Sequence, residues 1–128
     1  SIEPHYNYDG YTAYQSGFIL DKNFKESLKY DNFTINGYQI SKNPTGDNRI
    51  NLYDQTLYGV SENKANGVFF SLDGKSINKN TLIQNYGQPN SYSPTSAWGE
   101  EYMYKIGNKD VRFYIYNGYV IKCQIISE

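Results

Sequence analysis

The sequence of 128 residues is poor in several residue types that would indicate a particular chemistry. Its only cysteine is Cys123, so no disulfide can form within the chain, and a hydrophobic core must hold the fold together. One histidine, His5, and one cysteine cannot build a structural zinc site. No apolar run approaches the roughly 20 residues that a membrane-spanning helix needs, so we expect no membrane span.

The chain also lacks an excess of either charge. It has 12 basic and 13 acidic residues, for a formal net charge of -1. Nucleic-acid-binding domains usually carry a clear basic excess, so we expect no nucleic-acid partner. The opening residues have neither the basic nor the apolar region of a signal peptide. We therefore expect any lipid anchor to lie outside residues 1–128.

Candidate catalytic groups are equally scarce. A Cys123–His5 dyad is conceivable, but strand alternation places Cys123 on a buried face, where a structural thiol is the common case. Glu100 and Glu101 are neighbours on an expected strand and would point to opposite faces, unlike a catalytic carboxylate pair. We predict no enzymatic activity, no metal site and no cofactor.

What the sequence does contain is an order of short elements typical of an α+β fold. We predict one domain over residues 1–128, an antiparallel sheet with two or three short helices on one face, and a C-terminal three-stranded meander. Before the meander we expect first a hairpin around Asp9-Gly10, a helix at 22–29 capped by Asp21, and a strand or tight hairpin at 33–40. A helix from 47 or 48 that ends at Gly59 should follow, then a strand at 68–72 and a helix capped by Asn78 that ends at Gly87.

An alternative interpretation of the domain is a duplication, with degenerate strand-helix repeats at 33–72 and 70–128. Asn36-Gly37 and Asp73-Gly74 begin two similar segments, and each is followed by a candidate helix that ends in Tyr-Gly. Chance similarity in a chain rich in asparagine, tyrosine and glycine explains the same pattern.

The meander is expected to comprise strands at 102–106 and 111–116 and a third strand after Asn117-Gly118. A three-residue loop, Tyr116-Asn117-Gly118, would pair Ile115 with Tyr119 and sort the apolar side chains onto one face. A two-residue loop would pair Tyr116 with Tyr119 instead. The cleaner sorting favours the three-residue loop with a bulge. The side chains that it places on the buried face are Val111, Phe113, Ile115, Tyr119, Ile121, Cys123 and Ile125.

The segment from Phe70 to Ile126 also carries a set of short motifs. They are Thr81-Leu82-Ile83-Gln84-Asn85-Tyr86-Gly87-Gln88-Pro89, Tyr102-Met103-Tyr104, Val111-Arg112-Phe113 and Asn117-Gly118-Tyr119-Val120. In these motifs the segment resembles the C-terminal half of small exported lipoproteins of low-GC Gram-positive bacteria. The wider set is similar to the β-lactamase inhibitor protein and SmpA-like domains, in which helices pack on one face of an antiparallel sheet. The resemblance implies an extracytoplasmic protein-binding or assembly module, at the cell surface or secreted.

Aromatic residues are the one feature in surplus, at 17% of the chain with 15 tyrosines. Tyrosine, tryptophan and arginine are enriched at recognition surfaces, because each combines a large contact area with a polar group. Cross-strand tyrosine pairs that only stabilise an exposed face are the competing interpretation. Strand parity and the long loop at 90–99 together predict a binding patch of Tyr92, Trp98, Arg112, Tyr114, Tyr116 and Lys122.

The sequence therefore predicts a non-catalytic binding module that recognises another protein, as an inhibitor or an envelope-associated component. The alternative is a carbohydrate or cell-wall ligand that stacks on the exposed aromatic side chains.

Overall fold

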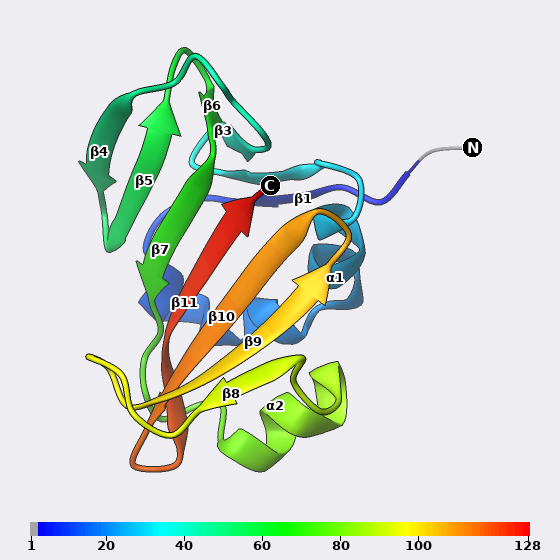
Figure 1. Ribbon diagram of the computed structural model, residues 1–128, viewed down its shortest axis with the longest axis vertical. Helices are drawn as coiled ribbons and strands as arrows, with labels where there is room; N and C mark the ends of the chain where they lie inside the picture. Colours follow the sequence, from blue (N-terminus) through cyan, green and yellow to red (C-terminus); the bar gives the residue numbers. More distant parts are fainter. Residues whose placement is uncertain (1–2) are drawn as a thin grey trace.

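Two β-sheets share one hydrophobic core in the computed structural model, which describes residues 3–128 (Figure 1). The larger sheet has seven strands, and every neighbouring pair in it is antiparallel. Its strands in spatial order are β4 (Asn48–Leu52), β5 (Gln55–Val60), β7 (Gly67–Ser71), β11 (Tyr119–Ser127), β10 (Lys109–Tyr116), β9 (Glu100–Ile106) and β8 (Ser91–Ser93). The smaller sheet has the order β1 (Tyr6–Tyr8), β2 (Phe33–Ile35), β3 (Tyr38–Ile40) and β6 (Lys64–Ala65).

Three short helices lie on the core side of the large sheet: the 3₁₀ helix η1 (Thr12–Leu20), α1 (Lys22–Leu28) and α2 (Lys79–Tyr86). Figure 1 looks onto the opposite face, with α1 behind the strands. Both α-helices begin as predicted, because the side chain of Asp21 accepts a hydrogen bond from the Asn23 amide and that of Asn78 from the Thr81 amide. No helix within residues 3–128 is long and apolar enough to cross a membrane.

The core confirms the predicted α+β fold with its C-terminal meander. Phe24 and Leu28 of α1 and Leu82 of α2 are fully buried, and the ring of Tyr86 packs edge-on against that of Phe113, with 4.9 Å between centroids. The meander contributes the alternate residues that strand parity predicted, which are Val111, Phe113, Ile115, Cys123 and Ile125.

The loop between β10 and β11 differs from the prediction. Tyr116 pairs with Tyr119 across the two-residue loop Asn117-Gly118, in which both residues have positive φ, so the predicted three-residue loop is wrong. The register shifts just beyond the Ile115–Val120 pair. In the rest of β11 the side chains then alternate between the two faces as predicted, with Cys123 opposite Phe113. Tyr119 and Ile121 are consequently not in the core, and Val120 takes the buried position instead.

The predicted hairpin around Asp9-Gly10 is also wrong. Strand β1 pairs in parallel with β2, and the chain then turns at Gly10 into η1. A distant side chain directs this path, because the carboxylate of Asp54 accepts hydrogen bonds from the amides of Thr12 and Ala13, both at 2.9 Å. No local turn signal in the sequence could report that contact.

The helix predicted from residue 47 or 48 to Gly59 is a hairpin of β4 and β5. The spacing that indicated a helix, Ile50 to Leu57, is also the spacing at which this hairpin pairs the two residues across the strands. One of the two helices on which the proposed duplication depends is therefore absent, and the duplication stays a hypothesis.

Candidate binding surface on the open face of the sheet

The face of the large sheet that points away from the core carries no helix among the described residues (Figure 1). We call it the open face. Cross-strand partners share a face, so the register identifies the side chains that point there. They include Phe69 of β7, Lys122 and Gln124 of β11, and Arg112, Tyr114 and Tyr116 of β10.

An aromatic cluster occupies one part of the open face. The ring of Trp98, from the loop before β9, lies 4.9 Å from that of Phe69 and 5.4 Å from that of Tyr114. The Lys122 ammonium stands over the Phe69 ring, 5.3 Å from its centroid. Trp98 remains 40% exposed, so it is held in place by the cluster and is still accessible to a partner. We call Trp98, Phe69 and Tyr114 the Trp98 cluster.

Tyr114 points to the predicted face but is only 4% exposed, so its predicted exposure is wrong. The loop that carries Trp98 folds back over β10 and covers it. Gly99 permits this close approach, because a β carbon there would lie 2.3 Å from the Ile115 carbonyl oxygen. Burial, followed by the nearby charge of Glu101, raises the pKa of the Tyr114 hydroxyl to about 12.

Charged side chains lie beside the Trp98 cluster. Arg112 approaches two carboxylates, with its Nε 3.8 Å from Glu101 Oε2 and its Nη1 3.9 Å from Asp110 Oδ2. Lys105 pairs with Asp110 at 3.0 Å. These ion pairs are half-exposed and contribute little stability, but they give the surface a defined pattern of charge.

Tyr92 does not join the other predicted site residues. Tyr92 pairs with Tyr102 across the strands, and the side chain of Tyr102 points to the helix side of the sheet. The hydroxyl of Tyr92 donates a hydrogen bond to Glu100 Oε1 at 3.0 Å. There it lines a separate hollow of about 400 Å³ with Gln88, Pro89 and Tyr102. The structure thus places Trp98, Arg112, Tyr114, Tyr116 and Lys122 on the open face and Tyr92 on the other.

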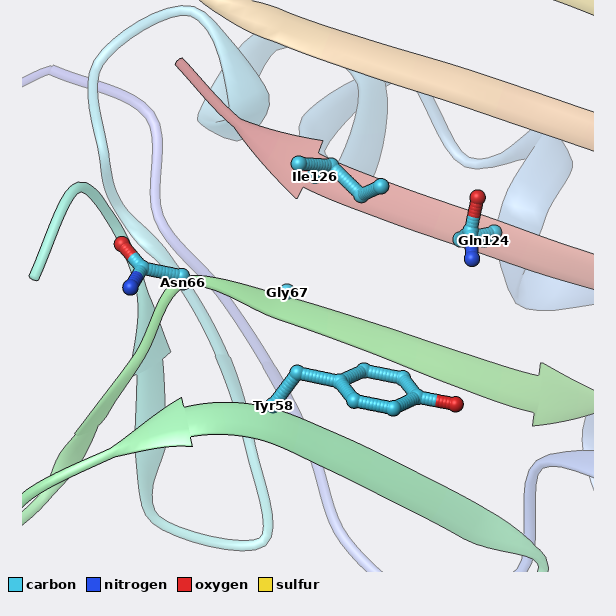
Figure 2. A pocket seen from close by; sticks show the side chains of 5 residues that line it. All are labelled: Tyr58, Asn66, Gly67, Gln124 and Ile126. Carbon is cyan, nitrogen blue, oxygen red and sulfur yellow. The ribbon is translucent and has the colours of Figure 1, made fainter. Parts of the chain in front are cut away.

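A hollow of about 330 Å³ on the open face was not predicted. Figure 2 shows the Tyr58 ring lying beside Gly67, across from Gln124 and Ile126, with Asn66 at the end. Gly67 leaves the floor free of a side chain, and a β carbon there would lie 2.9 Å from the Ile125 carbonyl oxygen. A glycine inside a strand is the sequence signal that could have indicated such a close approach.

The two candidate catalytic residues, Cys123 and His5, lie in different environments. Cys123 is fully buried, and burial raises the pKa of its thiol well above the ordinary value, which keeps the thiol protonated. His5 is exposed near the N-terminus. Within residues 3–128, no group of three or more His, Cys, Asp or Glu side chains is placed to hold a metal ion.

The fold and this surface define a small α+β protein built on an antiparallel sheet with one uncovered, aromatic face. A family model described as immunodominant staphylococcal antigen B matches residues 5–125, and the chain belongs to that family. It is 46% identical over 61 residues to the immunodominant staphylococcal antigen B of Staphylococcus aureus strain USA300, and equally to that of strain NCTC 8325 / PS 47. Each match covers 48% of this chain and 34% of the relative, so it spans about a third of the length of these proteins.

Among solved structures, the fold is similar to that of a DUF4309 family protein, YjgB, from Bacillus subtilis subsp. subtilis str. 168. The TM-score is 0.50 over 68% of this chain and 70% of that one, and at 14% identity the likeness concerns the fold alone. These similarities agree with the predicted resemblance to proteins of Gram-positive bacteria. The predicted likeness to the β-lactamase inhibitor protein and SmpA-like domains finds no confirmation in them.

Proposed function

We propose that this chain is an extracytoplasmic, non-catalytic binding module that recognises another protein through its open face. The observation that carries the proposal is Trp98, which is 40% exposed on an uncovered sheet and packed against Phe69 and Tyr114. An exposed aromatic side chain that is already held in place loses little conformational entropy on binding, which is what an interface hot spot requires.

The surroundings of Trp98 favour a protein as the ligand. Tyr116 is 59% exposed on the same face, which also carries Lys122 and the ion-paired Arg112. Protein interfaces combine such an aromatic centre with a charged rim. The hollow at Gly67, bounded by Tyr58 and Ile126, would accept an apolar side chain of the partner.

One observation supports a location outside the cytoplasm. The relatives are named immunodominant antigens, and an antigen that dominates an immune response is typically accessible on or outside the cell.

The proposal is tested with a photo-crosslinking amino acid at position 116, on the whole protein incubated with cell-surface extract. The matched control carries the same group at Tyr30, another exposed tyrosine that is not on the open face. We expect a protein cross-linked only from position 116. That protein, once purified, should bind the wild type saturably and bind Trp98→Ala and Tyr116→Ala at least about tenfold more weakly, or ~1.4 kcal/mol. Equal binding to the wild type and both variants would refute the open face as the site.

A further inference from the structure

A second aromatic surface lies away from the open face, where η1 begins. Tyr11 and Tyr14 stack with 4.8 Å between ring centroids, and Tyr53, from the turn between β4 and β5, packs edge-on against Tyr11 at 4.9 Å. All three rings are exposed, Tyr14 by 79%. We call these three residues the tyrosine platform. Three large aromatic side chains at the surface, with Tyr11 in contact with the other two, are not needed to fill the core.

Asp54 holds the tyrosine platform together. Its Oδ1 accepts from the Thr12 amide and its Oδ2 from the Ala13 amide, both at 2.9 Å, so the β4–β5 turn is fixed to the start of η1. Thr12 is itself fully buried, and its hydroxyl donates to the Ser71 carbonyl oxygen at 2.7 Å. The rings are therefore presented by backbone that is anchored on two strands, which lowers the entropic cost of binding a ligand.

The backbone of Tyr53 indicates that its ring has a use beyond stability. Its φ is +55°, in the left-handed region, where a β carbon is strained and where glycine or asparagine is usual. Two other two-residue turns with positive φ at their first position use Asn36-Gly37 and Asn117-Gly118, and a third has Glu62 there, at +54°. Tyr53 is the aromatic residue among them. A bulky, exposed side chain at a strained position is an observed outlier of the kind found at ligand-binding sites.

We propose that the tyrosine platform binds neutral oligosaccharides of equatorially substituted pyranose rings. Such a ring has a flat face of axial C–H groups, which stacks on an aromatic ring, and a rim of hydroxyls, which the tyrosine hydroxyls can meet. The platform shares no residue with the open face, so this inference stands apart from the proposed protein recognition.

The charges around the platform select a neutral ligand. The carboxylate of Asp54 is occupied by the Thr12 and Ala13 amides and by Gln55 Nε2. Among the described residues, no cation stands over any of the three rings; the cation–π contacts lie at Tyr58, Phe69 and Tyr86. A phosphate-bearing polymer gains most of its affinity from lysine and arginine side chains, whereas an uncharged sugar needs none.

The test uses the whole protein, labelled with ¹⁵N and titrated with cellohexaose and, separately, chitohexaose, with inorganic polyphosphate as the charged comparison. The variants are Tyr14→Ala, which removes the most exposed ring of the platform, and two matched exposed tyrosines elsewhere, Tyr30→Ala and Tyr116→Ala. Each variant's undisturbed amide spectrum confirms that it is folded before it is titrated.

We expect saccharide-dependent shifts at residues 11–14 and 53–54. We further expect at least about tenfold weaker binding by Tyr14→Ala, ~1.4 kcal/mol, and unchanged binding by Tyr30→Ala and Tyr116→Ala. Absence of shifts with both saccharides overturns the proposal, as do shifts confined to other residues. Polyphosphate binding at residues 11–14 and 53–54 overturns the proposal that the ligand is neutral. Loss of saccharide binding in Tyr116→Ala would show that the saccharide binds on the open face, and it would likewise overturn the proposal that the tyrosine platform is the site.

Discussion

The ammonium group of Lys109 and the carboxylate of Asp31, 78 residues apart in the sequence, form an ion pair at the C-terminal end of α1. The Lys109 side chain is fully buried, and its Nζ also donates to the carbonyl oxygen of Leu28, the last residue of α1, at 3.2 Å. A cation at this end of a helix is favourable. One lysine thus attaches α1 to the turn between β9 and β10.

Replacing this ammonium group should destabilise the fold. Lys109→Met keeps the apolar stem but leaves the Leu28 carbonyl without its donor, and we expect the free energy of unfolding to fall by about 2–3 kcal/mol. Lys105→Met, which removes an exposed lysine from the neighbouring strand, is the control and should change little. Urea denaturation measures both, and equal losses would show that burial of the Lys109 charge is not what matters.

Alanine substitutions along β10 should reduce stability by different amounts, because the three side chains differ in the face they occupy and in their burial. Phe113→Ala removes a fully buried ring and should cost about 3–5 kcal/mol. Tyr114→Ala should cost about 2 kcal/mol, because Trp98 and Phe69 bury this ring on the open face. Tyr116→Ala should stay within about 0.5 kcal/mol, since its ring is exposed. Thermal or urea unfolding of the three variants checks the order.

Alkaline pH should weaken the fold, and two of the groups that contribute are Tyr104 and Tyr114. Burial raises the pKa of Tyr104 and of Tyr114 to about 12, against 10.0 for an ordinary tyrosine. Between these values the unfolded chain loses the proton and the folded protein keeps it, so the free energy of unfolding falls as the pH rises. The stabilisation is complete below pH 10 and is lost as the pH approaches about 12.

Urea denaturation at a series of pH values, with tyrosinate absorbance followed in parallel, measures this decline. Tyr114→Phe removes one of the groups with a raised pKa and should make the decline shallower. A variant whose profile matches the wild type would exclude Tyr114 as a contributor.

Two neighbouring residues of the β4–β5 turn, Tyr53 and Asp54, should affect the stability of the fold differently. Tyr53→Gly relieves a left-handed conformation that costs about 1–2 kcal/mol and gives up one exposed ring contact, so stability should be unchanged or higher by up to about 1 kcal/mol. Asp54→Ala, at the next position, removes the acceptor of two amides and should cost about 1–2 kcal/mol. Urea denaturation should therefore show a lower free energy of unfolding for Asp54→Ala but not for Tyr53→Gly.

The thiol of Cys123 should report global unfolding. Because burial both covers it and raises its pKa, we expect no measurable reaction with a thiol reagent in the native state and full reaction in urea. Rapid labelling of the native protein would place Cys123 outside the core and contradict the register of β11. Cys123→Ser provides the blank.

The sequence predicts best where a local signal and the tertiary structure agree. Asp21 and Asn78 cap their helices, and alternation along 111–116 identifies the core side of β10. Both signals act within a few residues of the structure that they specify.

Three predictions of local structure were wrong, and a contact distant in the sequence decides the first of them. Asp54 draws residues 12–13 into η1, 42 residues away. The pairing of Ile50 with Leu57 across a hairpin has the same spacing as one face of a helix. The register shift between Tyr114 and Ile115 gives the alternation of side chains from which we had predicted a longer loop. The burial of Tyr114 and the meeting of Tyr11 with Tyr53 likewise depend on loops whose paths no periodicity encodes.

Strand β11 lies at the centre of the seven-stranded sheet, between β7 and β10, although it is the last strand in the sequence. The half of the sheet formed by β4, β5 and β7 has no partner in β10, β9 and β8 until residues 119–127 have been synthesised. During synthesis the chain therefore stays in two unjoined halves, each with an open edge, and cannot complete its core.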